Sequence, residues 1–171
     1  MTKLICTVIL IILLVSCRQQ ANKKHKNTGT TTKDNISTTI STDTSLLAGI
    51  IDITIFKPIA TKFKYTFINN SGQKERLSVP GPSDYYLEGL LYFDTPTFTT
   101  LKTKCLSGAY YAPSDSEKQH FYFEWLDNDI KKELLNSDTS HHGHIDACFG
   151  LGHSGKLWLL NNKVLLTKTT N

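Results

Sequence analysis

Apolar and polar side chains alternate along several short segments, and this two-residue period predicts β-strands. The clearest case is residues 62–68, in which Phe63, Tyr65 and Phe67 would share one face while lysines and a threonine occupy the other. From the same period, or from runs of β-branched and aromatic residues, we expect further strands at 49–56, 75–79, 85–93, 120–125, 145–149, 156–160 and 164–166. The last two flank a short turn at residues 161–163 and therefore predict a C-terminal hairpin.

One segment after these strands has helical spacing instead. Asp94 precedes Pro96, which places a capping side chain and a proline at the first turn of a helix. Phe98, Leu101 and Cys105 follow at intervals of three and four residues and would line one helical face. We therefore predict a helix that begins near residue 95.

A second short helix is predicted over residues 127–136. Asp127 can cap its N-terminus, and Ile130 and Leu134 lie one turn apart. Strands separated by two short helices, with hairpins at both ends, favour an α+β fold. In this fold a mainly antiparallel sheet would carry the two helices on one face.

The N-terminus has a different pattern, with one lysine followed by a continuous apolar run at residues 4–15. A membrane-spanning helix needs about 20 apolar residues, so this run is short for a permanent anchor. A basic start, a short apolar run and a small residue, here Ser16, are typical of a removable signal peptide. We expect residues 1–16 to be such a peptide.

Residues Leu14, Val15, Ser16 and Cys17 end this run, and together they resemble the lipobox of bacterial lipoproteins. The resemblance covers the leader alone and implies cleavage before Cys17 and transfer of lipid to its thiol. Two or three acyl chains would hold the protein at a membrane without any spanning helix. Arg18 stands where a common inner-membrane retention signal has aspartate, so the resemblance implies the outer membrane if the organism has one.

Residues 17–45 are rich in lysine, asparagine, threonine and serine, with almost no large apolar side chain. Such a composition buries too little surface to offset the entropy of ordering, so we expect a flexible linker ahead of one α+β domain at 46–171. Five basic side chains of this linker account for the formal net charge of +4. The charge therefore does not indicate nucleic-acid binding, which would need basic and aromatic residues on a folded face.

The strongest candidate for chemistry is a histidine-rich segment. On a strand, His142, His144, Asp146 and Cys148 would share one face, and all four are competent ligands for zinc or copper. Their spacing matches no established ligand pattern, and a solvated polar face predicts the same residues. Metal binding by these four residues is therefore the alternative function.

Cys105 and Cys148 are the two thiols that would remain in the mature chain, since Cys6 leaves with the leader and Cys17 carries lipid. In an oxidising compartment they can form a disulfide, and two reduced, buried cysteines are the other interpretation. A nucleophilic Cys148 with His144 or His153 as its base has no supporting motif around it.

The sequence therefore favours a lipid-anchored bacterial envelope protein that acts as a non-catalytic binding or interaction module. Its expected partners are the membrane, through Cys17, and an envelope protein. No cofactor is expected unless the alternative zinc or copper site forms. An enzyme is the third hypothesis, because the carboxylates and the glycine-rich segment at 150–155 match no catalytic or phosphate-binding pattern.

Overall fold

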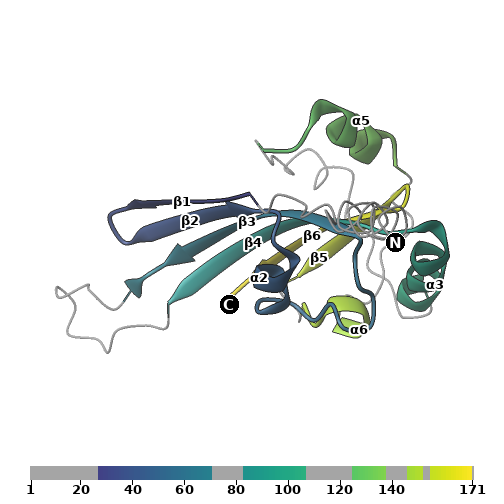
Figure 1. The fold of residues 1–171 in the computed structure, drawn as a ribbon, viewed down its shortest axis with the longest axis horizontal. Helices are drawn as coiled ribbons and strands as arrows, with labels where there is room; N and C mark the ends of the chain where they lie inside the picture. Colours follow the sequence, from purple (N-terminus) through teal and green to yellow (C-terminus); the bar gives the residue numbers. More distant parts are fainter. Residues whose placement is uncertain (1–26, 71–82, 107–124, 138–145, 152–154, 171) are drawn as a thin grey trace, which may run out of the picture.

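The computed structural model describes residues 27–70, 83–106, 125–137, 146–151 and 155–170. These residues form a six-stranded sheet with the order β1-β2-β3-β4-β6-β5, in which every neighbouring pair is antiparallel (Figure 1). The strands are β1 (Thr28–Lys33), β2 (Ile36–Ser41), β3 (Ala60–Ile68), β4 (Asp84–Tyr92), β5 (Lys156–Leu160) and β6 (Lys163–Thr169). The mainly antiparallel α+β class that the sequence predicted is confirmed.

The centre of the sheet follows the predicted pattern closely. Strands β3 and β4 pair over nine residues, from Ala60 opposite Tyr92 to Ile68 opposite Asp84. Strands β5 and β6 form the predicted C-terminal hairpin, closed by Asn161 and Asn162. Asn162 has a φ of 52°, a left-handed conformation that asparagine tolerates better than most residues.

The expected flexible linker was wrong for residues 28–45. Strands β1 and β2 form a hairpin there, and β2 pairs with β3 over six residues, so the hairpin continues the main sheet. Threonine favours strands because its branched Cβ fits a pleated surface. Across the hairpin the hydroxyl oxygens of Thr28 and Ser41 lie 2.6 Å apart, and those of Thr30 and Thr39 lie 3.0 Å apart.

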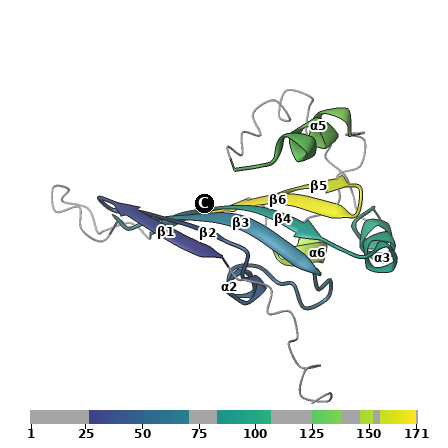
Figure 2. The ribbon, with the colours of Figure 1, turned by 45° about the horizontal axis from the view of Figure 1, so that its top comes forward.

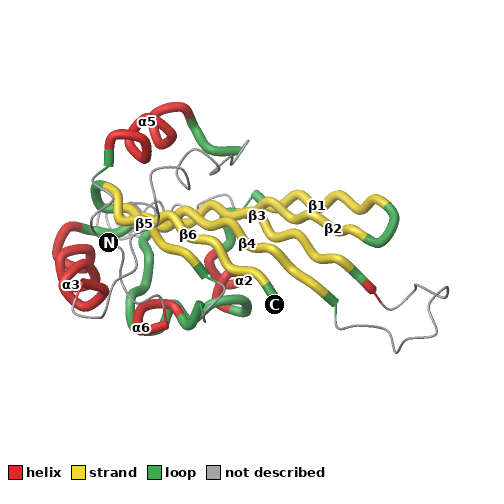
Figure 3. Tube along the Cα trace, turned by 180° about the vertical axis from the view of Figure 1, so that it is seen from behind, coloured by secondary structure: helices red, strands yellow, loops and turns green. Residues whose placement is uncertain are grey.

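Helices cover both faces of the sheet, so the prediction that they lie on one face was wrong. Figure 2 shows helices α2 (Thr44–Ala48), α3 (Thr95–Leu106) and α6 (Asp146–Phe149) on one side and α5 (Asn128–Asn136) on the other. The tube view from behind shows the same division (Figure 3). Strand alternation explains the division: Leu91 and Leu166 enter the core beside α2, α3 and α6, while Leu90 and Leu165 enter the core beneath α5.

The two predicted helices are confirmed as α3 and α5. The Asp94 carboxylate accepts a hydrogen bond from the Thr97 amide at 2.8 Å, as expected of a capping residue. In α3, Leu101 and Cys105 are buried, and in α5 Ile130 and Leu134 are buried, which matches the predicted apolar faces. Asp127 occupies the N-cap position of α5 but forms no capping hydrogen bond through its side chain.

Two predicted strands were wrong. Residues 49–56 have no regular structure, although Ile51, Ile53 and Phe56 are buried, because these side chains pack against the sheet from a loop and do not join it. Residues 146–149 form the short helix α6, so the alternation over 145–149 does not describe a strand. The predicted strand at 75–79 and residues 120–124 of the predicted strand at 120–125 lie outside the described residues, and Trp125 lies in a turn.

No helix among the described residues combines the length and the apolar character required to cross a membrane. The leader, including Cys17, lies outside the described part of the chain. The expectations for residues 1–17 therefore stay predictions from sequence.

Candidate functional site

A pocket of about 640 Å³ lies between α3, α5 and the turn that joins β5 to β6. Its apolar lining comes from Phe98 in α3 and from Leu159 and Leu160 in β5. Its polar lining comes from Lys102, Glu133, Asn136, Ser137 and Asn161. Small-molecule sites combine apolar lining residues with polar groups that fix orientation, and this pocket has a larger polar share than most such sites.

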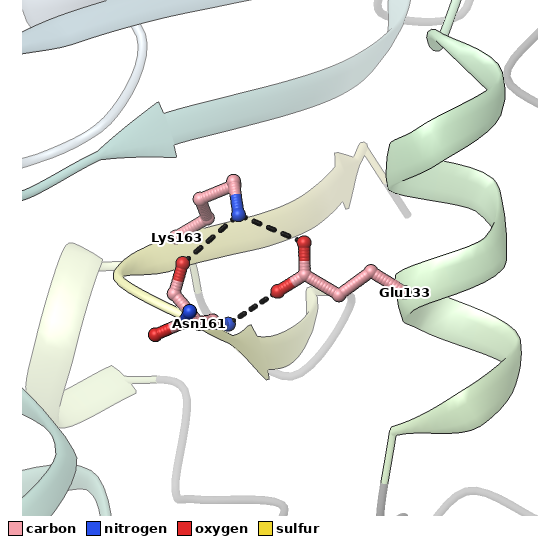
Figure 4. Close-up of polar contacts among 3 residues, drawn as sticks. All are labelled: Glu133, Asn161 and Lys163. Carbon is pink, nitrogen blue, oxygen red and sulfur yellow. Dashed lines mark hydrogen bonds and ion pairs between the residues drawn. The ribbon is translucent and has the colours of Figure 1, made fainter.

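Glu133 fixes one wall of this pocket (Figure 4). Its Oε1 accepts a hydrogen bond from the Asn161 amide at 2.5 Å, and its Oε2 lies 2.8 Å from Lys163 Nζ. Lys163 Nζ also donates to the carbonyl oxygen of Asn161 at 3.0 Å. One carboxylate thus joins helix α5 to both ends of the β5–β6 turn, so the wall is held in place before any ligand arrives.

Helical spacing explains why these side chains meet at the pocket. Phe98 and Lys102 are four residues apart on α3 and therefore lie on one side of that helix. Glu133 and Asn136 are three residues apart on α5, whose buried side is formed by Ile130 and Leu134. The pocket consequently forms where the less buried sides of the two helices approach the end of the sheet.

The two charged residues of the pocket lining, Lys102 and Glu133, differ in whether they have an ionic partner among the described residues. Glu133 has Lys163 as a close ionic partner. Lys102 forms no ion pair with any residue that the structure describes, and its side chain is exposed. The pocket therefore offers one available cation, two side-chain amides and an apolar lining, which suits a small molecule with an acidic group and an apolar part.

A second polar cluster lies on the α5 side of the central strand β4. The Glu88 side chain is 5% exposed, accepts a hydrogen bond from Trp125 Nε1 at 2.8 Å and lies 3.9 Å from Lys64 Nζ. Burial, followed by the charge of Glu88, raises the pKa of the neighbouring Tyr86 to about 12. These interactions give the buried carboxylate partners of its own, so we interpret this cluster as part of the core.

The metal site predicted from sequence does not have the expected geometry in its described half. Residues 146–149 form the helical turn α6 and not the strand on which the shared face was predicted. Cys148 Sγ is bonded to Cys105 Sγ, so it is not a free thiolate ligand or nucleophile. Within the described ranges, no three histidine, cysteine, aspartate or glutamate side chains gather as a metal site. His142, His144 and His153 lie outside those ranges.

The structure joins the other predicted pair, Cys105 and Cys148, in a disulfide between α3 and α6 with an S–S distance of 2.08 Å. Both cysteines belong to the larger hydrophobic core. This bond is the disulfide that the sequence analysis weighed against two reduced cysteines.

Sequence reasoning missed the pocket. Lys102 and Asn136 are single polar residues on exposed helix positions and Glu133 is a half-buried one, and polar helix residues usually only face solvent. The one available signal was the predicted turn after β5, whose Asn161 forms part of the wall. Nothing in the sequence indicates that this turn meets residues from 98 to 102 and from 133 to 137.

No protein-family model, curated protein or solved structure matches this chain. The pocket must therefore be interpreted from its own residues.

Proposed function

We propose that this protein is a lipid-anchored binding module of the bacterial envelope, whose pocket receives a small molecule with an acidic group and an apolar part. The observation that supports the binding role most directly is the fixed wall formed by Glu133, Asn161 and Lys163. A wall that is already ordered loses little further entropy when a ligand binds. Non-catalytic binding fits because Glu133, the one acidic residue among the pocket's lining, is engaged by these hydrogen bonds.

The acidic group is inferred from Lys102. Its amine belongs to the lining and has no ionic partner among the described residues, so a carboxylate that enters the pocket would find an available cation. Phe98 and Leu159 would contact the apolar part of the ligand. Glu133 would attract a competing cationic ligand less strongly than an unpaired carboxylate would, because Lys163 already compensates its charge.

The anchor is supported by the leader alone. Leu14, Val15 and Ser16 precede Cys17 at the end of an apolar run, as in the lipobox. Arg18 favours the outer membrane where one exists, and an envelope protein remains the proposed macromolecular partner. Mass spectrometry of the native N-terminus tests the anchor: acylated Cys17 is expected, and a retained Met1 or an unacylated Cys17 would exclude it.

Binding can be tested with hexanoate and with hexanol, which has the same chain length without the charge. Calorimetric titration of the purified mature protein should detect hexanoate binding that is at least fivefold tighter than hexanol binding. Lys102→Gln should remove this difference, because it removes the cation and keeps a polar side chain of similar length.

Lys132→Gln is the matched control, since Lys132 is an exposed lysine of α5 outside the pocket lining. The control should bind hexanoate like the unchanged protein. Equal loss in both variants, or hexanoate binding that Lys102→Gln leaves unchanged, would contradict the assignment of the pocket.

A further inference from the structure

Three large aliphatic side chains project into solvent from the segment between β2 and β3. Leu46 in α2 is 46% exposed, and Ile55 and Ile59 in the following loop are 55% and 57% exposed. Figures 1 and 2 both show α2 and this loop on the side of the sheet opposite α5. Exposed apolar side chains gathered on one side indicate a surface that contacts something other than water.

Buried neighbours hold these side chains outward. Leu47 follows Leu46, and Phe56 follows Ile55, and both neighbours are packed in the core. The hydroxyl oxygens of Thr44 and Thr61 lie 3.3 Å apart and connect α2 to the start of β3, two residues after Ile59. The outward positions of Leu46 and Ile55 are therefore set by the fold, because turning either side chain inward would displace a packed neighbour.

The chain enters the domain beside the same surface. The Thr42 amide donates to the Asn27 carbonyl oxygen at 3.0 Å, and the Asn27 amide donates to Thr42 Oγ1 at 3.2 Å. Asp43, the next residue, is the N-cap of α2. The start of the described chain is thus fixed within a few residues of Leu46.

Nine residues lie between Cys17 and Asn27, so the two are ten positions apart along the chain. Even when fully extended, ten residues span at most about 35 Å, so lipid on Cys17 would hold Asn27 within that distance of the bilayer. The sequence between them contains four basic residues, Arg18, Lys23, Lys24 and Lys26, which are attracted to anionic head groups. The chain length keeps the side of the domain that carries α2 within reach of the membrane, and the basic residues attract the adjoining chain to it.

We propose that Leu46, Ile55 and Ile59 form a membrane-contact surface that rests in the outer part of the bilayer when the protein is anchored. The proposed occupant of this surface is lipid, because the short chain to Cys17 keeps it within reach of the bilayer and because three aliphatic side chains beside the exposed Lys57 match an apolar layer under anionic head groups. The inference depends on the proposed anchor at Cys17 and adds an orientation that the anchor alone does not give.

Photo-crosslinking in vesicles tests this orientation. The acylated full-length mature protein would be reconstituted into phosphatidylethanolamine and phosphatidylglycerol vesicles with Ile59→p-benzoylphenylalanine. The matched control is Leu135→p-benzoylphenylalanine, because Leu135 is 59% exposed and lies on α5, on the opposite side of the sheet. Lipid adducts at position 59 should exceed those at position 135 at least fivefold.

A second probe, Leu46→p-benzoylphenylalanine, lies on α2 and not on the loop. It shows whether lipid contact extends beyond the loop that carries Ile59. Two outcomes would overturn the membrane-contact surface and leave the anchor intact, provided that mass spectrometry shows acylated Cys17. One is equal yields of lipid adducts at positions 59 and 135, and the other is no lipid adduct at positions 46 and 59. An unacylated N-terminus would instead overturn the anchor, and the surface with it.

Discussion

The two halves of the sheet are built differently. Where helices cover it, Leu87, Leu91 and Leu166 are fully buried between strands and helices. In the β1–β2 hairpin every residue of β1 is exposed, and the side chains are mainly threonine and serine. The first half is held by burial of apolar surface, and the second by backbone pairing and contacts between hydroxyl groups.

This difference shows that a strand needs no core of its own if a stable neighbour offers an edge. Strand β3 has the apolar residues that fix its position, such as Phe63, and its outer edge then provides hydrogen-bonding partners for β2. A hairpin alone is marginal in water, so β1 and β2 depend on β3. Stability should therefore be concentrated in the helix-covered half.

The largest difference in stability is expected between two alanine substitutions, one in each half of the sheet. Leu91→Ala should lower the free energy of unfolding by about 2–5 kcal/mol, because it leaves a cavity among fully buried side chains. Ile40→Ala in β2 should cost less than about 1 kcal/mol, since Ile40 is 42% exposed. Urea unfolding of both variants measures the difference, and equal losses would contradict the proposed division.

The disulfide joins α3 to α6 within the helix-covered half. The double variant Cys105→Ala, Cys148→Ala should lose up to about 4 kcal/mol, the entropic value expected for a loop with a sequence separation of 43 residues. Thermal unfolding with and without reductant provides the measurement, and the double variant should show no response to the reductant. A midpoint in the unchanged protein that reductant does not alter would argue against a closed disulfide.

Substitutions of Glu88 test whether a buried polar interaction contributes to the stability of the helix-covered half. Glu88→Ala removes the acceptor for Trp125 Nε1 and should cost about 1–3 kcal/mol, whereas Glu88→Gln keeps an acceptor oxygen and should recover most of that loss. Chemical unfolding combined with tryptophan fluorescence would follow both variants. If both variants lose equal stability, the charge and not the hydrogen bond is what matters.

The smallest effect is expected in β1. Thr30→Ala removes an exposed hydroxyl group that lies 3.0 Å from Thr39 Oγ1 and should change the free energy of unfolding by less than about 0.5 kcal/mol. Thr30→Val keeps the branched shape and serves as the control. A loss above 1 kcal/mol, specific to alanine, would show that β1 contributes more than edge pairing.

The sequence predicted those elements in which apolar residues recur at a regular interval and pack on one side. Strand β3 and helix α5 were predictable because Phe63, Ile130 and Leu134 are both periodic and buried. Strand β1 was not predictable, because an exposed strand of threonines has the same composition as a flexible linker. The two can be told apart only when the sheet edge with which the hairpin pairs is known.

The site was predicted less well than the fold. The histidine-rich candidate assumed a strand, but its described residues from 146 onward lie in the helical turn α6. An alternation of only five residues, 145–149, is too short to identify a strand with certainty. The pocket depends on the approach of three segments that are distant along the chain. Single residues such as Lys102 carry no local pattern that would reveal such an approach.

The bond between Cys105 and Cys148 also sets an order of events for the living cell. A cytoplasm that keeps thiols reduced delays closure until the chain has left it, if the protein is exported as we propose. The chain would thus be exported with both cysteines reduced and would form the disulfide only after export. Formation of the disulfide would then be the last step of maturation, and it would take place in the oxidising compartment.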